Sequence, residues 1–184
     1  MMRRRDPSWV RRADVVMLPD PRRVVSRIFL PGQEAAQPGA SRSAVIIERL
    51  LRLSDADIDA ELAAVCAAFA HRHRDIEGAW ARNFTLIEHR VEGASRLGHA
   101  RRLLVGATFT QEFAVEAAAL FNPSMVPHPD QGGLDAGDTR FLMTVRAVGE
   151  GHVSSVEFRT GTIDAGGVVD IDPSAEVAVL PSVV

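Results

Sequence analysis

The chain has 184 residues, 46% of them hydrophobic and 24% charged, which is enough to bury a core and to form one or two domains. Its net charge of -3 excludes a strong overall attraction to nucleic acid or to an anionic membrane, and we expect neither as a partner. The single cysteine, Cys66, excludes an intrachain disulfide and a multi-cysteine metal site. No stretch has the length and apolar character of a membrane span or a signal peptide, so the expected location is cytoplasmic.

Residues 1–40 show no sustained periodicity and are expected to form an extended N-terminal arm and a loop. Pro19, Pro21 and Pro31 interrupt the short segments that could be extended, and residues 33–41 have the composition of a loop or linker. The Arg cluster at the start of the chain is interpreted as a solvated arm, because isolated charge runs are usually hydrated.

Residues 41–121 have helical periodicity and predict a helical segment. Ser54 followed by Asp57 has the pattern of a capping box, which predicts the start of a helix, and Cys66 on its apolar face is interpreted as a small core residue. An Ala-rich stretch, residues 95–120, is expected to form one long helix or two helices broken near 106–110. The helical segment is expected to end at Asn122, because Pro123 disfavours the α conformation before it.

Residues 122–184 predict an antiparallel β-meander, so the expected fold class is α+β. Turn-rich segments separate four candidate strands. Four consecutive antiparallel strands have the shape of one propeller blade or of a small open sheet. The candidate strands span residues 124–127, 140–148, 152–163 and 168–179.

Arg146 lies within the apolar strand FLMTVRAV and is the first candidate for chemistry. Alternation places it on one face of the strand with Leu142 and Thr144. An Arg at a face position of such an apolar strand needs a partner or a polar ligand, because an unpaired buried charge is costly. The residues alone leave two interpretations open, an Arg–Glu pair that ties the strand to its turn and a ligand-binding Arg.

Two long segments resemble a known family. They read AALFNPSMVPHPDQGGL and RFLMTVRAVGEGHVSSVEFRTG, and the preceding LPDPRRVVSRIFLPG and HRHRDIEGAWARNF extend the likeness over nearly the whole chain from about Asp14. The pattern resembles the opening blade of glycoside hydrolase family 130, the mannoside phosphorylases and glycosidases built on a five-bladed β-propeller. It is most similar to a bacterial branch with a helical extension before the propeller.

The resemblance implies a sugar-binding role for Asn122 and Arg146, which match the Asn-Pro and Arg-Ala pairs of the family. Glu150, His152 and Ser154 lie in the matching turn and strand and are weaker candidates for the rim of the pocket. The implied substrate is a mannosyl oligosaccharide, with inorganic phosphate as a co-substrate and no cofactor. Planar Arg groups suit both sugar hydroxyls and phosphate.

The family's catalytic acid has no counterpart in this sequence, so we expect a sugar-binding N-terminal part that is inactive by itself. A single blade leaves apolar faces unmatched, which a fragment, coverage by the helical segment or homo-oligomerisation would explain. The alternative function is non-catalytic, either a truncated remnant or a helical protein-interaction module.

Two further groups of residues are candidates for sites. His71 and His73 lie two residues apart on an expected helix and point in different directions, so they are interpreted as a solvated helix end and not as a metal pair. Glu112 and Glu116 lie one helical turn apart in the expected helix. Because no matching His ligands accompany them, a solvated or Arg-paired face is the preferred interpretation.

Overall fold

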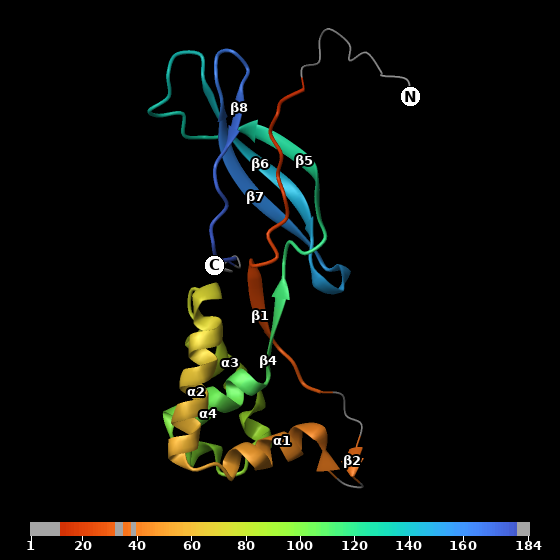
Figure 1. The fold of residues 1–184 in the computed structure, drawn as a ribbon, viewed down its shortest axis with the longest axis vertical. Coiled ribbons are helices and arrows are strands. Elements are labelled where there is room, and N and C mark those ends of the chain that lie inside the picture. Colours follow the sequence, from red (N-terminus) through yellow and green to blue (C-terminus); the bar gives the residue numbers. More distant parts are fainter. Residues whose placement is uncertain (1–11, 32–34, 38–39, 180–184) are drawn as a thin grey trace. The chain divides into compact units, whose positions relative to one another are not determined.

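A computed structural model of the chain describes residues 12–31, 35–37 and 40–179 and has an α+β fold (Figure 1). Its contacts divide the chain into two compact units. The sheet unit comprises Met1–Pro21 and Val115–Ala175, and the helical unit comprises Arg22–Ala114 and Glu176–Val184. Each unit therefore combines segments that are distant in the sequence.

The described residues of the helical unit form four α-helices, three short 3₁₀ turns and two small β-ribbons. Ser54 Oγ accepts the backbone N–H of Asp57 at 3.2 Å, and the Asp57 carboxylate accepts the N–H of Ser54 at 3.3 Å, which confirms the predicted capping box. The helices are α1 Arg42–Leu51, α2 Asp55–Phe69, α3 Ile76–Ile87 and α4 His99–Thr108. The 3₁₀ turns are η1 Ala70–Arg72, η2 Glu88–Arg90 and η3 Ala94–Arg96. The ribbons pair β1 Val24–Ile28 with β4 Thr110–Ala114, and β2 Ala35–Gln37 with β3 Ala40–Ser41.

The core of the helical unit lies between α3, α4 and their neighbours. Trp80 and Phe84 of α3 are almost fully buried, as the three- and four-residue spacing predicts. Gly106 of α4 lets the two helices approach closely, since a Cβ at this position would lie 2.0 Å from the carbonyl oxygen of Trp80. Cys66 is half-buried against one of the core clusters, which confirms its predicted place in the packing.

The sheet unit is an antiparallel meander of four strands in the order β5-β6-β7-β8, which does not close into a barrel and confirms the predicted meander. Alternate residues of β6 are buried and begin with Phe141, Met143 and Val145. Met17 packs against these three buried residues and belongs to the N-terminal segment that runs along the sheet in Figure 1. The strands are β5 Ala119–Pro127, β6 Thr139–Val148, β7 Ser154–Ile163 and β8 Val169–Ile171, with the 3₁₀ turn η4 Glu150–His152 between β6 and β7.

The expected helix over residues 95–120 is wrong beyond Thr108. Residues 110–114 form β4, which pairs in register with β1, and residues from Ala119 onward belong to β5. Val24 and Val25 of β1 are buried in this ribbon. Pairing with an apolar strand therefore outweighs the helix propensity of the Ala-rich stretch, because propensity is a weak preference that tertiary contacts override.

Asn122 and Pro123 do not end a helix but interrupt the register within β5. The pairing with β6 shifts between Phe121 and Ser124, which is the mark of a β-bulge. Asn122 has a left-handed backbone with φ 53°, a conformation that Asn tolerates better than most residues. The bulge accommodates Pro123, which has no N–H to donate to the neighbouring strand.

The expected last strand and the expected linker over residues 33–41 also need correction. The last strand was expected over residues 168–179 but is limited to Val169–Ile171, because Pro173 cannot continue the ladder. Within the expected linker over residues 33–41, the described residues form the β2–β3 ribbon. The Arg cluster interpreted as a solvated arm lies mainly in residues 1–11, outside the described residues.

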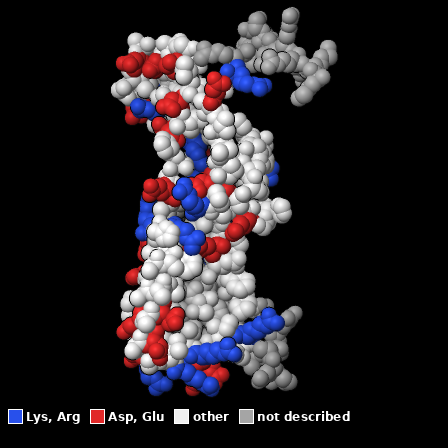
Figure 2. Space-filling view, in the orientation of Figure 1, with Lys and Arg blue, Asp and Glu red and all other residues white. Residues whose placement is uncertain are grey.

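Acidic and basic side chains are interspersed on the face of the molecule shown in Figure 2. This mixture agrees with the small net charge of -3. Among the described residues, no helix is both long enough and apolar enough to cross a membrane.

Candidate functional site

Asn122 and Arg146 are brought together by the pairing of β5 with β6. Phe121 is the cross-strand partner of Arg146, and Asn122 is the next residue, in the bulge. Directly opposed residues of antiparallel strands place their side chains on one face of the sheet. The Arg146 guanidinium accordingly lies over the Phe121 ring, with 5.1 Å between its carbon and the ring centroid.

Ser154, another of the predicted site residues, fixes the orientation of Arg146. Its Oγ accepts hydrogen bonds from Nε at 3.2 Å and from Nη2 at 3.0 Å. Arg146 pairs with Val156 in the register of β6 and β7. Ser154 precedes Val156 by two residues in β7 and therefore lies on the same face of the sheet. The remaining nitrogen of the fork, Nη1, has no hydrogen-bond partner among the described residues and is available for a ligand.

Arg146 lies on the exposed face of the sheet, which corrects the premise that it is a buried charge. Leu142 and Thr144 on the same face are half-buried, whereas the alternate residues of β6 are covered. Arg146 therefore carries little cost of desolvation, and no buried acid is needed to compensate it. Its contacts, Phe121 and Ser154, hold the guanidinium plane in place at an open surface.

Glu150 and His152 belong to the turn η4, at the end of the sheet where β6 leads into β7. Both side chains are exposed, and His152 has a left-handed backbone with φ 59°. The turn is closed by hydrogen bonds from the N–H of Gly149 to the Val153 carbonyl and from the N–H of Val153 to the Glu150 carbonyl. These residues lie near Arg146 in the chain, in the turn that joins its strand to β7.

The arrangement of Phe121, Asn122, Arg146 and Ser154 suits binding rather than proton transfer. It presents a planar cation and a hydroxyl beside an aromatic ring, and the Asn122 amide belongs to the residue that follows this ring. Such groups match ligands that carry several hydroxyls, because Arg and Asn donate to oxygen lone pairs and an aromatic face accepts an apolar ring face. We call these four residues the Arg146 site.

Glu112 and Glu116 do not share a helix, which corrects their expected placement, although each is paired with Arg as preferred. Glu116 is 1% exposed and forms an ion pair with Arg159, which is 7% exposed. Its second oxygen accepts the backbone N–H of Asp20 at 3.3 Å. The pair ties β7 to the segment before the helical unit and is a structural element of the sheet unit.

The interpretation of His73 as part of a solvated helix end is wrong. Its side chain is 9% exposed, and its Nε2 lies 2.7 Å from Oε1 of Glu112 on β4. Arg72 binds the other oxygen of Glu112 at 2.8 Å. Residues 73 and 112 are 39 positions apart, so no local pattern could have revealed this contact.

Comparisons of the chain with family models, with curated proteins and with solved structures give no match. Within the described residues, no group of three or more His, Cys, Asp or Glu side chains could hold a metal ion. The assignment of function therefore rests on the geometry of the Arg146 site and on the residues from which it is built.

Proposed function

We propose that the chain is the N-terminal part of a family-130-like β-mannoside phosphorylase or glycosidase, and that the Arg146 site binds a mannosyl oligosaccharide. The observation that carries the proposal is that Arg146 lies on the exposed face of the sheet and that Asn122 directly follows Phe121, the cross-strand partner of Arg146. These are the two residues to which the sequence resemblance gives a sugar-binding role. The open four-stranded meander has the strand order of a single propeller blade, which also supports the proposal.

The chemistry of the site agrees with a sugar ligand. The Arg146 fork donates through Nη1 to a sugar oxygen while Ser154 holds its other two nitrogens. The Asn122 amide offers both a donor and an acceptor, as a hydroxyl group requires. Phe121 provides an apolar surface beside these polar groups.

The proposal assigns binding, and not cleavage, to these residues. Cleavage of a glycoside requires a carboxylic acid that protonates the leaving oxygen, and a nucleophile, which is phosphate in a phosphorylase. The family's acid has no counterpart in this sequence. Glu150 and His152 are placed at the rim, where they contact substituents of the sugar instead of the bond that breaks.

Calorimetric titration of the chain with β-mannobiose tests this function. We expect saturable binding that the Arg146→Ala substitution weakens about tenfold, equivalent to about 1.4 kcal/mol. Arg146→Lys should weaken binding nearly as much, because Lys keeps the charge but loses the planar fork. Arg49→Ala, at an exposed position of α1 in the helical unit, is the matched control and should leave the affinity unchanged.

The same samples, incubated with β-mannobiose and phosphate, should form no mannose 1-phosphate. Rapid formation of this product would contradict the assignment of binding alone. Equal affinities of the wild-type chain and of Arg146→Ala would remove Arg146 from the sugar site. Absence of binding by the wild-type chain would favour the non-catalytic alternative.

A further inference from the structure

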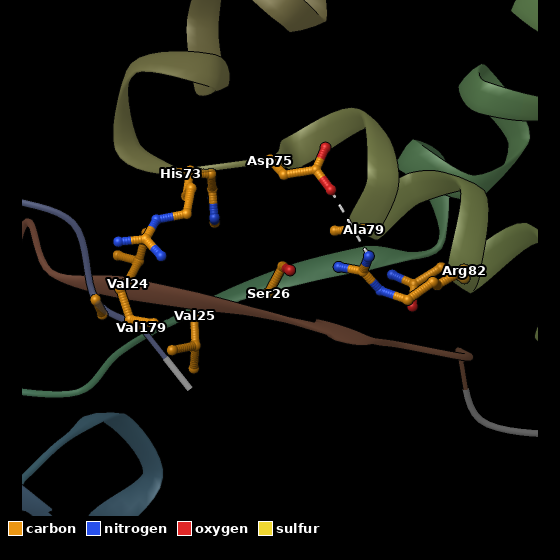
Figure 3. A pocket seen from close by; sticks show the side chains of 11 residues that line it. Val24, Val25, Ser26, His73, Asp75, Ala79, Arg82 and Val179 are labelled. Carbon is orange, nitrogen blue, oxygen red and sulfur yellow. Dashed lines mark ion pairs between the residues drawn. The ribbon is translucent and has the colours of Figure 1, made fainter. Parts of the chain in front are cut away.

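The helical unit has a cavity of about 320 Å³ that is separate from the Arg146 site (Figure 3). One part of its wall is apolar and is formed by Val24 and Val25 of β1 and by Ala79 of α3. Ligand pockets are commonly about 300–1,000 Å³, mostly apolar, with a few polar groups that fix the orientation of the ligand. The size of this cavity therefore suits a small molecule with a short apolar body.

The polar part of the wall carries an excess of positive charge. Arg74 and Arg82 contribute two positive charges and Asp75 one negative charge, which leaves a net charge of +1 when His73 is neutral. Asp75 is already engaged, since its Oδ1 accepts the backbone N–H of Gly78 at 2.8 Å and its Oδ2 lies 3.8 Å from Arg82, the contact drawn in Figure 3. The Asp75 carboxylate is thus shared between the helix cap and Arg82.

His73 and Ser26 add hydrogen-bonding groups to the same wall. The His73 ring is held by Glu112, which is in turn bound by Arg72, so it is positioned before any ligand arrives. Ser26 and Glu112 are cross-strand partners in the β1–β4 ribbon, which places Ser26 beside this cluster. Groups that are already ordered lose less conformational entropy on binding and therefore contribute more to affinity.

We propose that this cavity binds a small organic oxyanion, a carboxylate or a phosphate monoester with a short aliphatic body. The oxyanion lies against Arg74 and Arg82, where charge-assisted hydrogen bonds form, and Ser26 and His73 provide further contacts. The aliphatic body packs on Val24, Val25 and Ala79. The proposal rests on residues of the helical unit alone and is independent of sugar binding in the sheet unit.

Titration of the full chain, followed by backbone amide chemical shifts, tests the proposal with butyrate, butyl phosphate and n-butanol as probes. We expect saturable shifts of Ser26, His73 and Ala79 with at least one of the two anions. The anion that binds more tightly identifies the head group, carboxylate or phosphate. The neutral alcohol should bind at least about tenfold more weakly, and added salt should weaken binding of the anions.

The double variant Arg74→Ala/Arg82→Ala should weaken binding of the anion about tenfold or more. Arg74 and Arg82 are exposed, so the variant is expected to fold, which circular dichroism would check. Arg49→Ala/Arg90→Ala, which removes two exposed Arg residues outside the cavity, is the control and should bind as the wild-type chain does. Unsaturable shifts with both anions, equal binding of n-butanol, or an unchanged affinity of the double variant would each overturn the proposal.

Discussion

Glu116 and Arg159 form an ion pair in which both side chains are buried, with exposures of 1% and 7%. Arg159 Nη1 also lies 3.8 Å from Oε2 of Glu157, but this contact is longer than a hydrogen bond. Removal of one partner from a buried pair is costly, because the remaining charge loses its closest compensating group and stays out of water. Glu116 is therefore held in place by electrostatics and not by packing alone.

Glu116→Ala should lower the free energy of unfolding by about 3 kcal/mol, because it removes the closest acid from the buried Arg159 guanidinium. Chemical denaturation with urea measures this change. Asp135→Ala, at an exposed position of the same unit, is the control and should change stability by less than about 0.5 kcal/mol. A loss for Glu116→Ala no larger than that of the control would show that the pair does not stabilise the sheet unit.

Burial raises the pKa of the Cys66 thiol above its ordinary value, and the nearby Glu77 carboxylate raises it further. The Sγ atom lies 3.9 Å from Oε1 of Glu77. Because the thiolate is the reactive form, alkylation of Cys66 by iodoacetamide at pH 8 should be slower than that of a free cysteine. Glu77→Gln removes the negative charge, lowers the pKa and should increase the rate.

Glu88→Gln, which removes an exposed acid from η2, is the control for this measurement. It should leave the alkylation rate unchanged. If Glu77→Gln and Glu88→Gln give the same rate as the wild-type chain across pH 7 to 10, then Glu77 does not influence the Cys66 thiol.

At the scale of elements, the packing of α3 on α4 depends on Gly106. Gly106→Ala should destabilise the chain by about 3 kcal/mol, because the added methyl group would lie 2.0 Å from the Trp80 carbonyl oxygen and force the backbones apart. This loss outweighs the gain of about 1 kcal/mol that Ala brings to a helix interior. Thermal unfolding followed by circular dichroism measures the difference.

Gly98→Ala, at the N-cap of the same helix, is the control, since no atom lies within 4 Å of the position that its Cβ would take. Its effect should stay within about 0.5 kcal/mol. A Gly106→Ala variant as stable as Gly98→Ala would show that the two helices are not in close backbone contact.

The elements that the sequence predicts best are those with a strong local pattern. The capping box at Ser54 and the alternation of Phe141 to Val148 are local signals, and both lead to the observed elements. Strand β4 was missed because its sequence is compatible with a helix and becomes a strand only by pairing with β1. Long-range pairing is a property of the fold and has no signature in a short window of sequence.

The candidate sites also combine residues that a local pattern indicates with contacts that only long-range pairing creates. Arg146 was singled out from its own strand, but its contacts with Phe121 and Ser154 depend on the register of three strands. The cluster of His73 with Glu112 was not predicted, because it joins a turn before α3 to β4. Residue types alone indicate which groups are available, and the pairing of elements determines which groups meet.

At the scale of the whole molecule, the two faces of the sheet differ. One face is covered within the sheet unit, where Met17 and Leu120 pack on the buried residues of β6. The other face carries exposed apolar side chains, among them Val156 and Phe158, next to Arg146. Homo-oligomerisation through such a face stays a prediction, and the Arg146 site lies on the same surface.

Backbone amide shifts of the wild-type chain, recorded during titration with β-mannobiose, test the central claim most directly. Binding of the sugar at the Arg146 site should give saturable shifts that gather at Phe121, Asn122, Arg146 and Ser154 and are absent from the cavity lined by Val24 and His73. Saturable shifts that gather away from these four residues, or no saturable shifts at all, would contradict it.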